Sequence, residues 1–377
     1  MKKYLLLSFI PLLFLSVSEG QSGICKQCHP TIYREYYQSA HRKASVYNDP
    51  VHGAWWKLMS KKKQGGYTCA KCHSPSDPEA LEHGILTDNR IQREGPISCV
   101  HCHTIDHIQQ NDASNTNITT GKTREFFTAE ASKKGSGVAH FQTHTSWFGL
   151  NRSVENSPFH KINYNNENYY NGNVCMGCHA HTDNEHGVDI LMLDAFIDKK
   201  DKETCISCHM PQVPGTKVTL KHTPTHAYHG FAGIHNMTEA LGKYIDFNVS
   251  RTADGFDITI VNHANHALFG QAYREGVLKV SINHNGKERA LQPAVFTRVF
   301  GKNGKESFPW EATETLKDSL IYGKKKLHYP VKLYKGDTLT LVLGAKRVSE
   351  AGMKALHLQK HSELTRFKPL KYGSYHF

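Results

Sequence analysis

Every cysteine in the chain belongs to one of five Cys-x-x-Cys-His segments, and this pattern limits the possible folds more than any other feature of the sequence. Two thiols three positions apart can both bond to one edge of a porphyrin, and the adjacent histidine can then bind the iron. The ten cysteines are Cys25, Cys28, Cys69, Cys72, Cys99, Cys102, Cys175, Cys178, Cys205 and Cys208. The histidines that close the segments are His29, His73, His103, His179 and His209. The pattern predicts five covalently attached haem c groups, with these histidines as proximal iron ligands.

Other uses of paired cysteines fit the sequence less well. Zinc sites would need the pairs to converge two by two, and they would give no reason for a histidine after every second cysteine. A thioredoxin-like dithiol would occur once, on a strand–helix–strand pattern. A disulfide framework is common in exported chains, but it does not require this repeated spacing.

The composition agrees with an interior filled largely by cofactor. Apolar residues make up only 38% of the chain, and all five segments lie between residues 25 and 209. The formal charge of +12 would by itself suggest an anionic partner such as nucleic acid or a membrane. Ten haem propionates would bring a charge of about −10, however, if they are ionised. We therefore interpret the basic excess as compensation for the cofactors and expect no nucleic-acid partner.

The N-terminus has the layout of a secretory signal peptide over residues 1–20. Lys2 and Lys3 precede an apolar run from residue 4 to residue 17, and small residues follow at Ser18 and Gly20. The run is short for a membrane span, so cleavage is expected rather than retention as an anchor. The mature chain is expected to be exported to the periplasm, or to associate with the outer surface, with no integral membrane segment.

The chain has far more histidines than the motifs use, 26 against five. Bis-histidine haems, whose axial ligands stay the same on oxidation and reduction, would need five more. His41 follows a stretch with apolar residues at helical spacing, and Pro30 suits the start of that helix. His41 lies twelve residues after His29, roughly 18 Å along a helix, so it is expected to bind the iron of a neighbouring haem.

Further candidates for the sixth ligand come from three other segments. His107 lies one helical turn after His103, and His160 follows a polar, irregular stretch. His226 and His229 both lie just beyond the fifth motif, and the sequence does not decide between them. Each of these histidines could instead be a solvated or core residue.

Three stretches of the motif region together resemble a known family. They are Cys25-x-x-Cys-His-Pro-x-x-Tyr-x-x-Tyr-x-x-Ser-x-His41, Gly95-Pro-Ile-Ser-Cys99-Val-His-Cys-His103 with His107 after it, and Cys205-Ile-Ser-Cys-His-Met-Pro211 with a His-x-Phe-x-Gly segment from His229 to Gly233. Over residues 23–240 the chain is similar to the multihaem cytochromes c related to hydroxylamine oxidoreductase and the tetrahaem cytochrome of nitrification. The resemblance implies a mostly helical, loop-rich domain with closely stacked haems. It also implies that His41, His107, His160 and His229 bind the irons of haems attached elsewhere.

After about residue 240 cysteine disappears, and apolar and polar residues alternate. Strands are predicted over residues 244–250, 256–260, 277–282, 294–300, 328–333 and 338–343, with turns such as Asp254-Gly255, Asn285-Gly286 and Asn303-Gly304. Short, regular strands of this kind predict an antiparallel β-sandwich. The expected fold is therefore α+β and multidomain, with a signal peptide (1–20), a pentahaem cytochrome c domain (21–240) and a β-sandwich domain (241–377).

A second resemblance concerns one loop of the C-terminal region. The segment Asn262-His-Ala-Asn-His266-Ala-Leu-Phe-Gly270 resembles a loop of β domains fused to multihaem cytochromes, in which a histidine binds a haem of the preceding domain. The resemblance implies that His266 is a distal ligand, and His263 competes for the role. Leu268 and Phe269 stand where the similar loops have Pro-Thr.

The expected function is electron transfer through closely stacked bis-histidine haems. The expected partners are other redox proteins, such as periplasmic or membrane-bound cytochromes or quinol-oxidising complexes. The alternative is a multihaem oxidoreductase that acts on nitrite, hydroxylamine or a sulfur compound at one five-coordinate haem. All five motifs end in histidine, whereas pentahaem nitrite reductases usually have lysine at the active haem. Motifs of other enzyme classes are absent from the sequence, so no catalytic residue is assigned.

Overall fold

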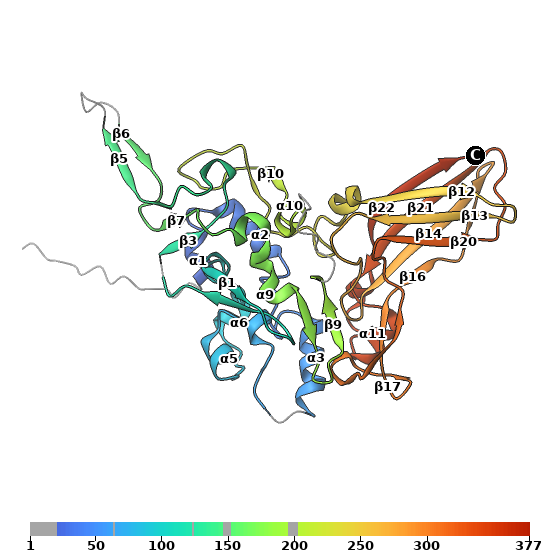
Figure 1. Cartoon of the computed structure of the whole chain (residues 1–377), viewed down its shortest axis with the longest axis horizontal. Helices are drawn as coiled ribbons and strands as arrows, with labels where there is room; N and C mark the ends of the chain where they lie inside the picture. Colours follow the sequence, from blue (N-terminus) through green and yellow to red (C-terminus); the bar gives the residue numbers. More distant parts are fainter. Residues whose placement is uncertain (1–20, 63–64, 123, 146–151, 195–202) are drawn as a thin grey trace, which may run out of the picture.

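The computed structural model describes residues 21–62, 65–122, 124–145, 152–194 and 203–377. The signal peptide expected over residues 1–20 lies outside the described residues. Short helices and small hairpins make up the N-terminal part of the chain, and long strands make up the C-terminal part (Figure 1). Within the described ranges, no helix combines the length and apolar character needed to cross a membrane.

The helices of the N-terminal part are short, and several of them begin with a proline or with a side chain that caps the first turn. Examples are α2, α3, α5 and α6. The longest is α3, with 11 residues; the Asp49 carboxylate accepts hydrogen bonds from the amides of Val51 and His52, and Pro50 suits the first turn. The α-helices of this part are α1 (Gln21–Cys25), α2 (Pro30–Gln38), α3 (Pro50–Ser60), α4 (Ala70–His73), α5 (Pro78–Glu82), α6 (Arg90–Glu94), α7 (Cys99–His103), α8 (Asn168–Asn171), α9 (Met176–His179) and α10 (Cys205–His209), and the 3₁₀ turns are η1 (Ala131–Lys133), η2 (Asn173–Cys175) and η3 (Thr238–Tyr244).

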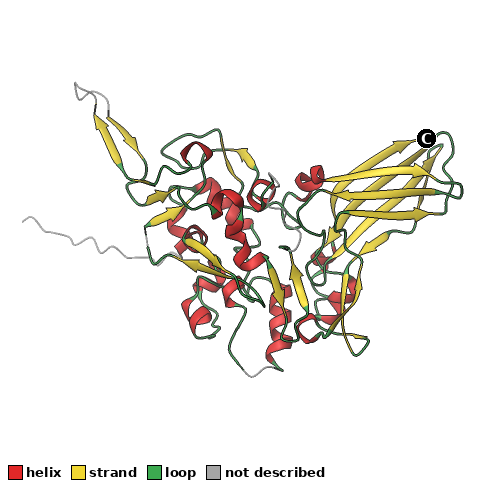
Figure 2. Ribbon diagram, viewed as in Figure 1, coloured by secondary structure: helices red, strands yellow, loops and turns green. Residues whose placement is uncertain are grey.

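Strands are more common in this part than a mostly helical domain allows, so that expectation is corrected. Antiparallel pairs join β1 to β2, β5 to β6, β8 to β9 and β10 to β11, and β7 pairs with β3 in parallel and with β4 antiparallel. Figure 2 shows these short strands among the helices, except β5 and β6, which project away from them. Their bounds are β1 (Ile105–Gln109), β2 (Thr116–Thr119), β3 (Glu125–Phe127), β4 (Val138–Ala139), β5 (Gln142–Thr145), β6 (Arg152–Glu155), β7 (Lys161–Asn163), β8 (His181–Asp183), β9 (Asp189–Met192), β10 (Gln212–Pro214) and β11 (Thr225–Ala227).

The C-terminal part contains two antiparallel sheets with one hydrophobic core between them. The strand order is β12-β13-β20 in one sheet and β15-β14-β21-β22 in the other, where β16 also pairs with β14; a third, small sheet has the order β18-β17-β19. Helices and antiparallel sheets in one chain confirm the α+β class. The bounds are β12 (Ile245–Arg251), β13 (Phe256–Asn262), β14 (Glu275–His284), β15 (Lys287–Ala290), β16 (Ala294–Phe296), β17 (Arg298–Lys302), β18 (Lys305–Glu306), β19 (Glu314–Asp318), β20 (Lys324–Tyr329), β21 (Asp337–Lys346), β22 (Lys368–His376), α11 (Glu350–Ala355), η4 (Pro309–Glu311) and η5 (Ser362–Thr365).

Two of the predicted strands differ from the strands in the structure. The segment expected as one strand over residues 294–300 forms both β16 and β17, and the chain changes sheets at Thr297, whose hydroxyl donates to the Arg274 carbonyl at 3.1 Å. The strand expected over residues 328–333 is β20, which ends at Tyr329. Pro330 follows directly, and proline has no amide hydrogen to donate to a neighbouring strand.

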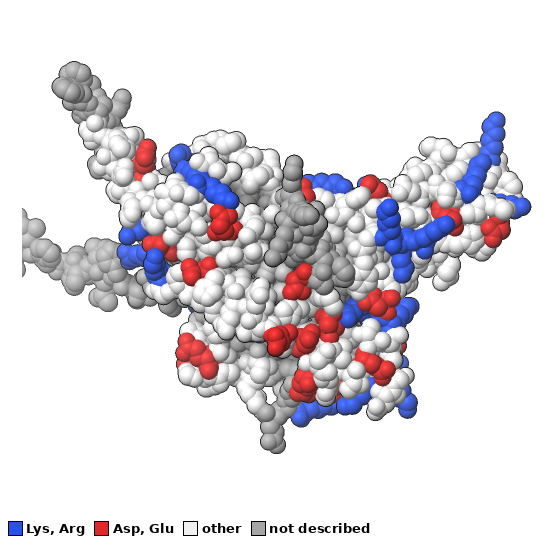
Figure 3. All heavy atoms as spheres, viewed as in Figure 1, with Lys and Arg blue, Asp and Glu red and all other residues white. Residues whose placement is uncertain are grey.

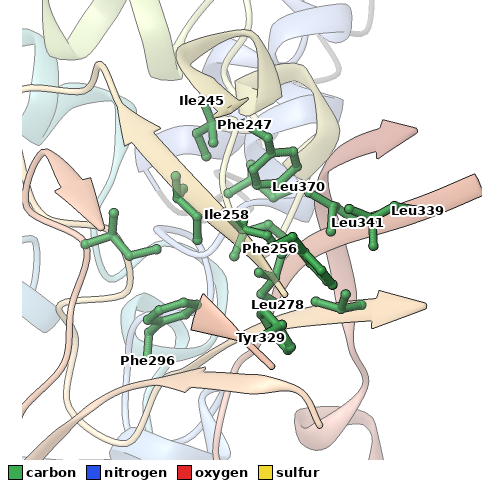
Figure 4. Close-up of a cluster of buried hydrophobic side chains, with 14 of the residues drawn as sticks. Ile245, Phe247, Phe256, Ile258, Leu278, Phe296, Tyr329, Leu339, Leu341 and Leu370 are labelled. Atoms are coloured by element: carbon green, nitrogen blue, oxygen red, sulfur yellow. The ribbon is translucent and has the colours of Figure 1, made fainter. Parts of the chain in front are cut away.

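The core of the sandwich is built from alternate residues of each strand. Phe256, Ile258 and Ile260 of β13 are fully buried, and Leu278 of β14 and Leu341 of β21 are fully buried in the same cluster (Figure 4). Side chains at these alternate positions point to one face of a strand, so the two sheets bury a continuous apolar layer.

Leu278→Ala is expected to lower the free energy of unfolding by about 2–5 kcal/mol, because removal of a fully buried leucine leaves a cavity. Guanidinium unfolding followed by far-ultraviolet circular dichroism measures the loss. Leu316→Ala is the control, since Leu316 of β19 is 39% exposed, and its expected loss is about 0.5 kcal/mol. Equal losses in both variants would contradict the assignment of Leu278 to the core.

Helix α3 joins the two parts of the chain. Its side chains Trp55 and Met59 belong to a hydrophobic cluster with Trp310 and Met353 of the C-terminal part, and the ring centres of Trp55 and Trp310 are 5.0 Å apart. Polar contacts add to this cluster: Arg298 with Asp189 (3.2 Å), Arg347 with Asp49 (2.6 Å), and Asn184 Nδ2 with the carbonyls of Pro309 and Ala312 (both 2.8 Å). Loops of the sandwich are therefore placed against the region of the five motifs.

Candidate metal centres

Each Cys-x-x-Cys-His segment is folded into a single helical turn. Helices α4, α7, α9 and α10 end at the motif histidine, and after α1 the amide of His29 donates to the carbonyl of Cys25 at 2.8 Å. Ser98 and Thr204 cap α7 and α10 with their side-chain oxygens. Because residues three and four apart share one helix face, each turn brings both thiols and the imidazole to one side. All ten cysteine side chains are half-buried thiols.

Four of the five motif histidines donate a hydrogen bond from Nδ1 to a backbone carbonyl. The pairs are His29 with Lys217 (2.7 Å), His73 with Ala44 (3.0 Å), His103 with Phe127 (2.8 Å) and His209 with Ala232 (2.6 Å). This bond fixes the tautomer and the orientation of the ring, and it leaves the lone pair on Nε2. The same arrangement is typical of metal-bound histidine.

Four motif histidines face a second histidine at nearly the same distance. The distances between ring centres are 6.2 Å for His29 and His160, 5.9 Å for His179 and His41, 6.3 Å for His103 and His229, and 6.0 Å for His209 and His266. His266 belongs to the C-terminal part, in the loop after β13. The structure thus brings four of the five candidate distal ligands to a motif histidine.

These distances fit one iron atom between the two rings of each pair. A metal–imidazole bond is about 2.0–2.1 Å long and the nitrogen lies about 1.2 Å from the ring centre, so two rings on opposite sides of one metal have centres about 6.4 Å apart. The Nδ1 atoms of His229 and His266 donate to the carbonyls of Ala227 (2.7 Å) and Ala267 (3.0 Å), which again leaves the lone pair on Nε2. The donor sets therefore fit haem iron with two axial histidines.

Burial keeps these imidazoles neutral. It lowers the pKa of His41 to about 3 and the pKa values of His179 and His229 to about 4. Burial also lowers the pKa values of His73, His103, His160 and His266. A metal needs the lone pair of a neutral imidazole, so these side chains are in the ligand form at pH 7.

His41 lies in the turn after α2 rather than on a helix that continues to it. Helix α2 starts at Pro30, as expected, but ends at Gln38 with Ser39 in an extended conformation. The edge of the His41 ring contacts the Phe231 ring, with 4.1 Å between centres. The turn therefore directs His41 away from its own motif, toward the motif that contains His179.

The structure distinguishes between the two histidines that follow the fifth motif. His226 is only 1% exposed, and both of its ring nitrogens are hydrogen-bonded, Nδ1 with the carbonyl of Gly215 (3.1 Å) and Nε2 with the carboxylate of Glu35 (2.9 Å). It has no ring nitrogen left for a metal. His229 instead faces His103, so the geometry favours His229 as the ligand.

Two other candidates lie in exposed positions beside carboxylates. The side chain of His263 is 50% exposed, with Nε2 at 2.8 Å from Asp246, and that of His107 is 59% exposed, with Nδ1 at 3.0 Å from Asp106. The expected helical turn between His103 and His107 is absent, because α7 ends at His103 and the extended strand β1 begins at Ile105. β-Branched Ile105 favours such an extended backbone.

His73 differs from the other motif histidines. Its ring stacks on the ring of His52, with centres 3.8 Å apart and an angle of 18° between the planes. Nε2 of His52 is hydrogen-bonded to the Tyr67 hydroxyl at 2.9 Å. His52 was not predicted as a site residue. It lies in the first turn of α3, and no motif surrounds it in the sequence. At 3.8 Å the two rings cannot bind opposite sides of one iron.

The mutual influence of cysteines from different motifs shows which segments are neighbours. Cys99 raises the pKa of Cys25, Cys178 lowers the pKa of Cys72, and Cys175 lowers the pKa of Cys205. The first motif therefore adjoins the third, and the fourth adjoins both the second and the fifth. Cys102 and Cys175 also interact electrostatically, which connects the third motif to the fourth. Each of the five segments therefore has at least one other as a neighbour, and the fourth is next to three of them: the second, the third and the fifth.

Comparisons with known proteins identify two likenesses. The family model of cytochrome c554 and c-prime matches residues 24–104, which contain three of the five motifs. The crystal structure of a penta-heme cytochrome c552 from Thermochromatium tepidum superposes with a TM-score of 0.68 at 21% sequence identity, over 94% of this chain and 98% of that chain. No curated protein matches the sequence. The two likenesses support a multihaem cytochrome c with covalently bound haem, whereas the wider resemblance to hydroxylamine oxidoreductase stays a prediction.

Proposed function

We propose that the chain is an exported pentahaem c-type cytochrome that transfers electrons between redox partners in the periplasm or at the cell surface. When bound, each haem supplies an iron that alternates between the ferrous and ferric states. The observation that carries this proposal is the set of four histidine pairs with ring centres 5.9–6.3 Å apart. Two rigid axial imidazoles suit electron transfer because the coordination need not change with oxidation state.

The residues have distinct roles in this proposal. The ten motif cysteines attach the cofactors, and the five motif histidines are the proximal ligands. The distal ligands are His160, His41, His229 and His266, opposite His29, His179, His103 and His209 respectively. His107 is not retained as a ligand, because its side chain is exposed and paired with Asp106. Cysteines of neighbouring motifs lie close together, so successive cofactors would be attached close together, as electron transfer requires.

The proposed partners are other redox proteins rather than nucleic acid. On the face shown in Figure 3, lysine and arginine side chains are interspersed with acidic ones and do not form one continuous basic stripe. A nucleic-acid interface would need such a stripe to neutralise successive phosphates. Mixed charges suit short-lived docking of another soluble or membrane-bound electron carrier.

A second candidate function belongs to the motif that ends in His73. This function is the binding and turnover of a small nitrogen or sulfur compound by an oxidoreductase. It is favoured by the stacking of His52 on His73, since His52 cannot occupy the opposite axial position in this arrangement. The hydrogen bond from Tyr67 also engages Nε2 of His52. An iron with one protein ligand can accept an exogenous one.

Electron paramagnetic resonance of the oxidised protein, with spin quantitation, separates the two candidates. We expect four low-spin haems from the four histidine pairs and one high-spin haem that responds to cyanide, from the His73 motif. A pyridine haemochrome assay should count five haems per chain. The His52→Ala variant should keep the same single high-spin haem, because His52 is not a ligand in this arrangement.

Each alternative result would refute a particular part of the proposal. Five low-spin haems that do not respond to cyanide would exclude the oxidoreductase and leave an electron carrier. Two or more high-spin haems would contradict at least one of the four histidine pairs. A second high-spin haem that appears only in His52→Ala would identify His52 as a ligand.

A further inference from the structure

A cavity of about 230 Å³ lies where the two parts of the chain meet. Lys43 and Asp49 line it from the segment between α2 and α3, and His235 lines it from the segment before η3. Arg347 and Lys368, from the ends of β21 and β22 that face this junction, complete the charged lining. The volume exceeds that of a few water molecules and is small for a large organic ligand.

The lining has more positive than negative charge. Lys43, Arg347 and Lys368 are cationic, and Asp49 is the one acidic residue in the lining. Asp49 already binds Arg347 at 2.6 Å and accepts hydrogen bonds from the first turn of α3 at the amides of Val51 (2.8 Å) and His52 (3.3 Å). Lys368 Nζ donates to the backbone carbonyl of His235 at 3.2 Å, and neither Lys43 nor Lys368 has an acidic partner in the lining.

A further cation next to the cavity increases this imbalance. Burial, and then the charge of Arg347, lower the pKa of Arg274 to about 10. Its Nε is buried without a hydrogen-bond partner among the residues that the structure describes. Burial together with Arg347, Arg274, Lys368 and Lys43 lowers the pKa of His235 to about 3, so His235 adds no charge but shows that these four cations surround it.

Such a cluster is costly unless an anion accompanies it. Like charges in a partly desolvated space repel one another, and the buried Nε of Arg274 has lost its hydration without gaining an acceptor among the described residues. Lys368 is the first residue of β22 and Arg274 directly precedes β14, so both cations come from the C-terminal part of the chain. An anion with several acceptor oxygens would satisfy the lysine ammonium groups and the guanidinium group together.

We propose that this cavity, lined by Lys43, Arg347 and Lys368 with Arg274 behind them, binds an oxyanion that bridges the two parts of the chain. The oxyanion is either a haem propionate or a free small anion, since both present anionic oxygens that accept charge-assisted hydrogen bonds. The assignment of the oxyanion to a haem propionate rests on the proposed function, which supplies the haem. The second motif adjoins the cavity, because Ala44, next to Lys43, accepts the hydrogen bond from His73 at 3.0 Å.

Sulfate titration of the full-length holoprotein at constant ionic strength tests the free-anion source. The melting temperature should rise with sulfate and reach a plateau, and the apparent affinity should fall at least fivefold in Lys43→Met and in Lys368→Met. Lys287→Met is the matched control, because Lys287 lies exposed on β15, and it should respond like the wild type. Lys43 is itself exposed, so its substitution removes charge without removing packing even if Lys368→Met fails to fold.

Redox titration of the same proteins tests the propionate source. A cation beside a propionate disfavours the ferric state, so its removal should lower the midpoint potential of one haem in Lys43→Met and in Lys368→Met. Lys287→Met should leave all potentials unchanged, and sulfate should then have no specific effect on any of the proteins. The proposal is overturned if both cavity variants match Lys287→Met in the sulfate titration and in the redox titration. A haem count below five would instead refute the proposed function, and the sulfate titration would still report on the cavity.

Discussion

Replacement of His266 by alanine is expected to convert one low-spin haem into a high-spin haem. His266 faces His209 with 6.0 Å between ring centres, which fits a shared iron. The loop that presents it is anchored by Asn262, whose amide donates to the carbonyls of His266 (2.9 Å) and Ile321 (3.0 Å). Spin quantitation by electron paramagnetic resonance should show one additional high-spin haem per chain.

The same variant should also weaken the contact between the two parts of the chain. In the proposed arrangement His266 is a residue of the C-terminal part bound to a cofactor that is attached to the N-terminal part. A ligand bond of this kind stabilises the folded state in which both parts are docked. We expect thermal unfolding of His266→Ala to begin at a lower temperature, with a separate transition for the sandwich.

His263→Ala is the matched control for both measurements. His263 lies three residues earlier in the same loop, is half exposed and binds Asp246 at the surface. Its removal should leave the spin states and the unfolding temperature close to those of the wild type. A new high-spin haem in His263→Ala, together with an unchanged His266→Ala, would reverse the assignment of these two residues.

Features set by local sequence were the ones that could be predicted. The Cys-x-x-Cys-His spacing requires only one helical turn, so the ten cysteines and five histidines could be predicted to attach haem without any knowledge of the fold, and the structure does fold each segment into such a turn. The alternation of the sandwich strands is likewise local, and β12, β13, β14 and β21 lie where the pattern indicated. Where a proline or a change of sheet intervened, at Pro330 and Thr297, the predicted bounds were wrong.

Features set by contacts between distant segments could not be predicted. His107 was placed by helical spacing, but the backbone becomes extended at Ile105, and its side chain lies at the surface. The stacking of His52 on His73 depends on how α3 packs, which no local pattern around His52 indicates. The cation cluster of the cavity combines Lys43 with Arg347 and Lys368, which are about 300 residues further along the chain.

The second large effect is expected from replacement of the two histidines after the fifth motif. We expect His229→Ala to change a haem spin state and His226→Ala to change stability. His229→Ala should produce one high-spin haem, because His229 faces His103 at 6.3 Å and its Nδ1 donates to the Ala227 carbonyl. His226→Ala should leave every haem low-spin. It should lower the free energy of unfolding by about 1–3 kcal/mol, because it removes a buried side chain and one of the two hydrogen-bond donors to the partly buried Glu35 carboxylate.

Glu35 explains why the two effects are separable. Its carboxylate accepts one hydrogen bond from Nε2 of His226 and another from the backbone amide of His229, both at 2.9 Å. The side chain of His226 thus holds the segment that contains both histidines against Glu35, and the side chain of His229 faces His103 of the third motif. Chemical denaturation and spin quantitation on the two variants measure the two roles independently. A high-spin haem in His226→Ala with unchanged stability, or a stable, fully low-spin His229→Ala, would show that the roles are exchanged and that the ring geometry does not identify the ligand.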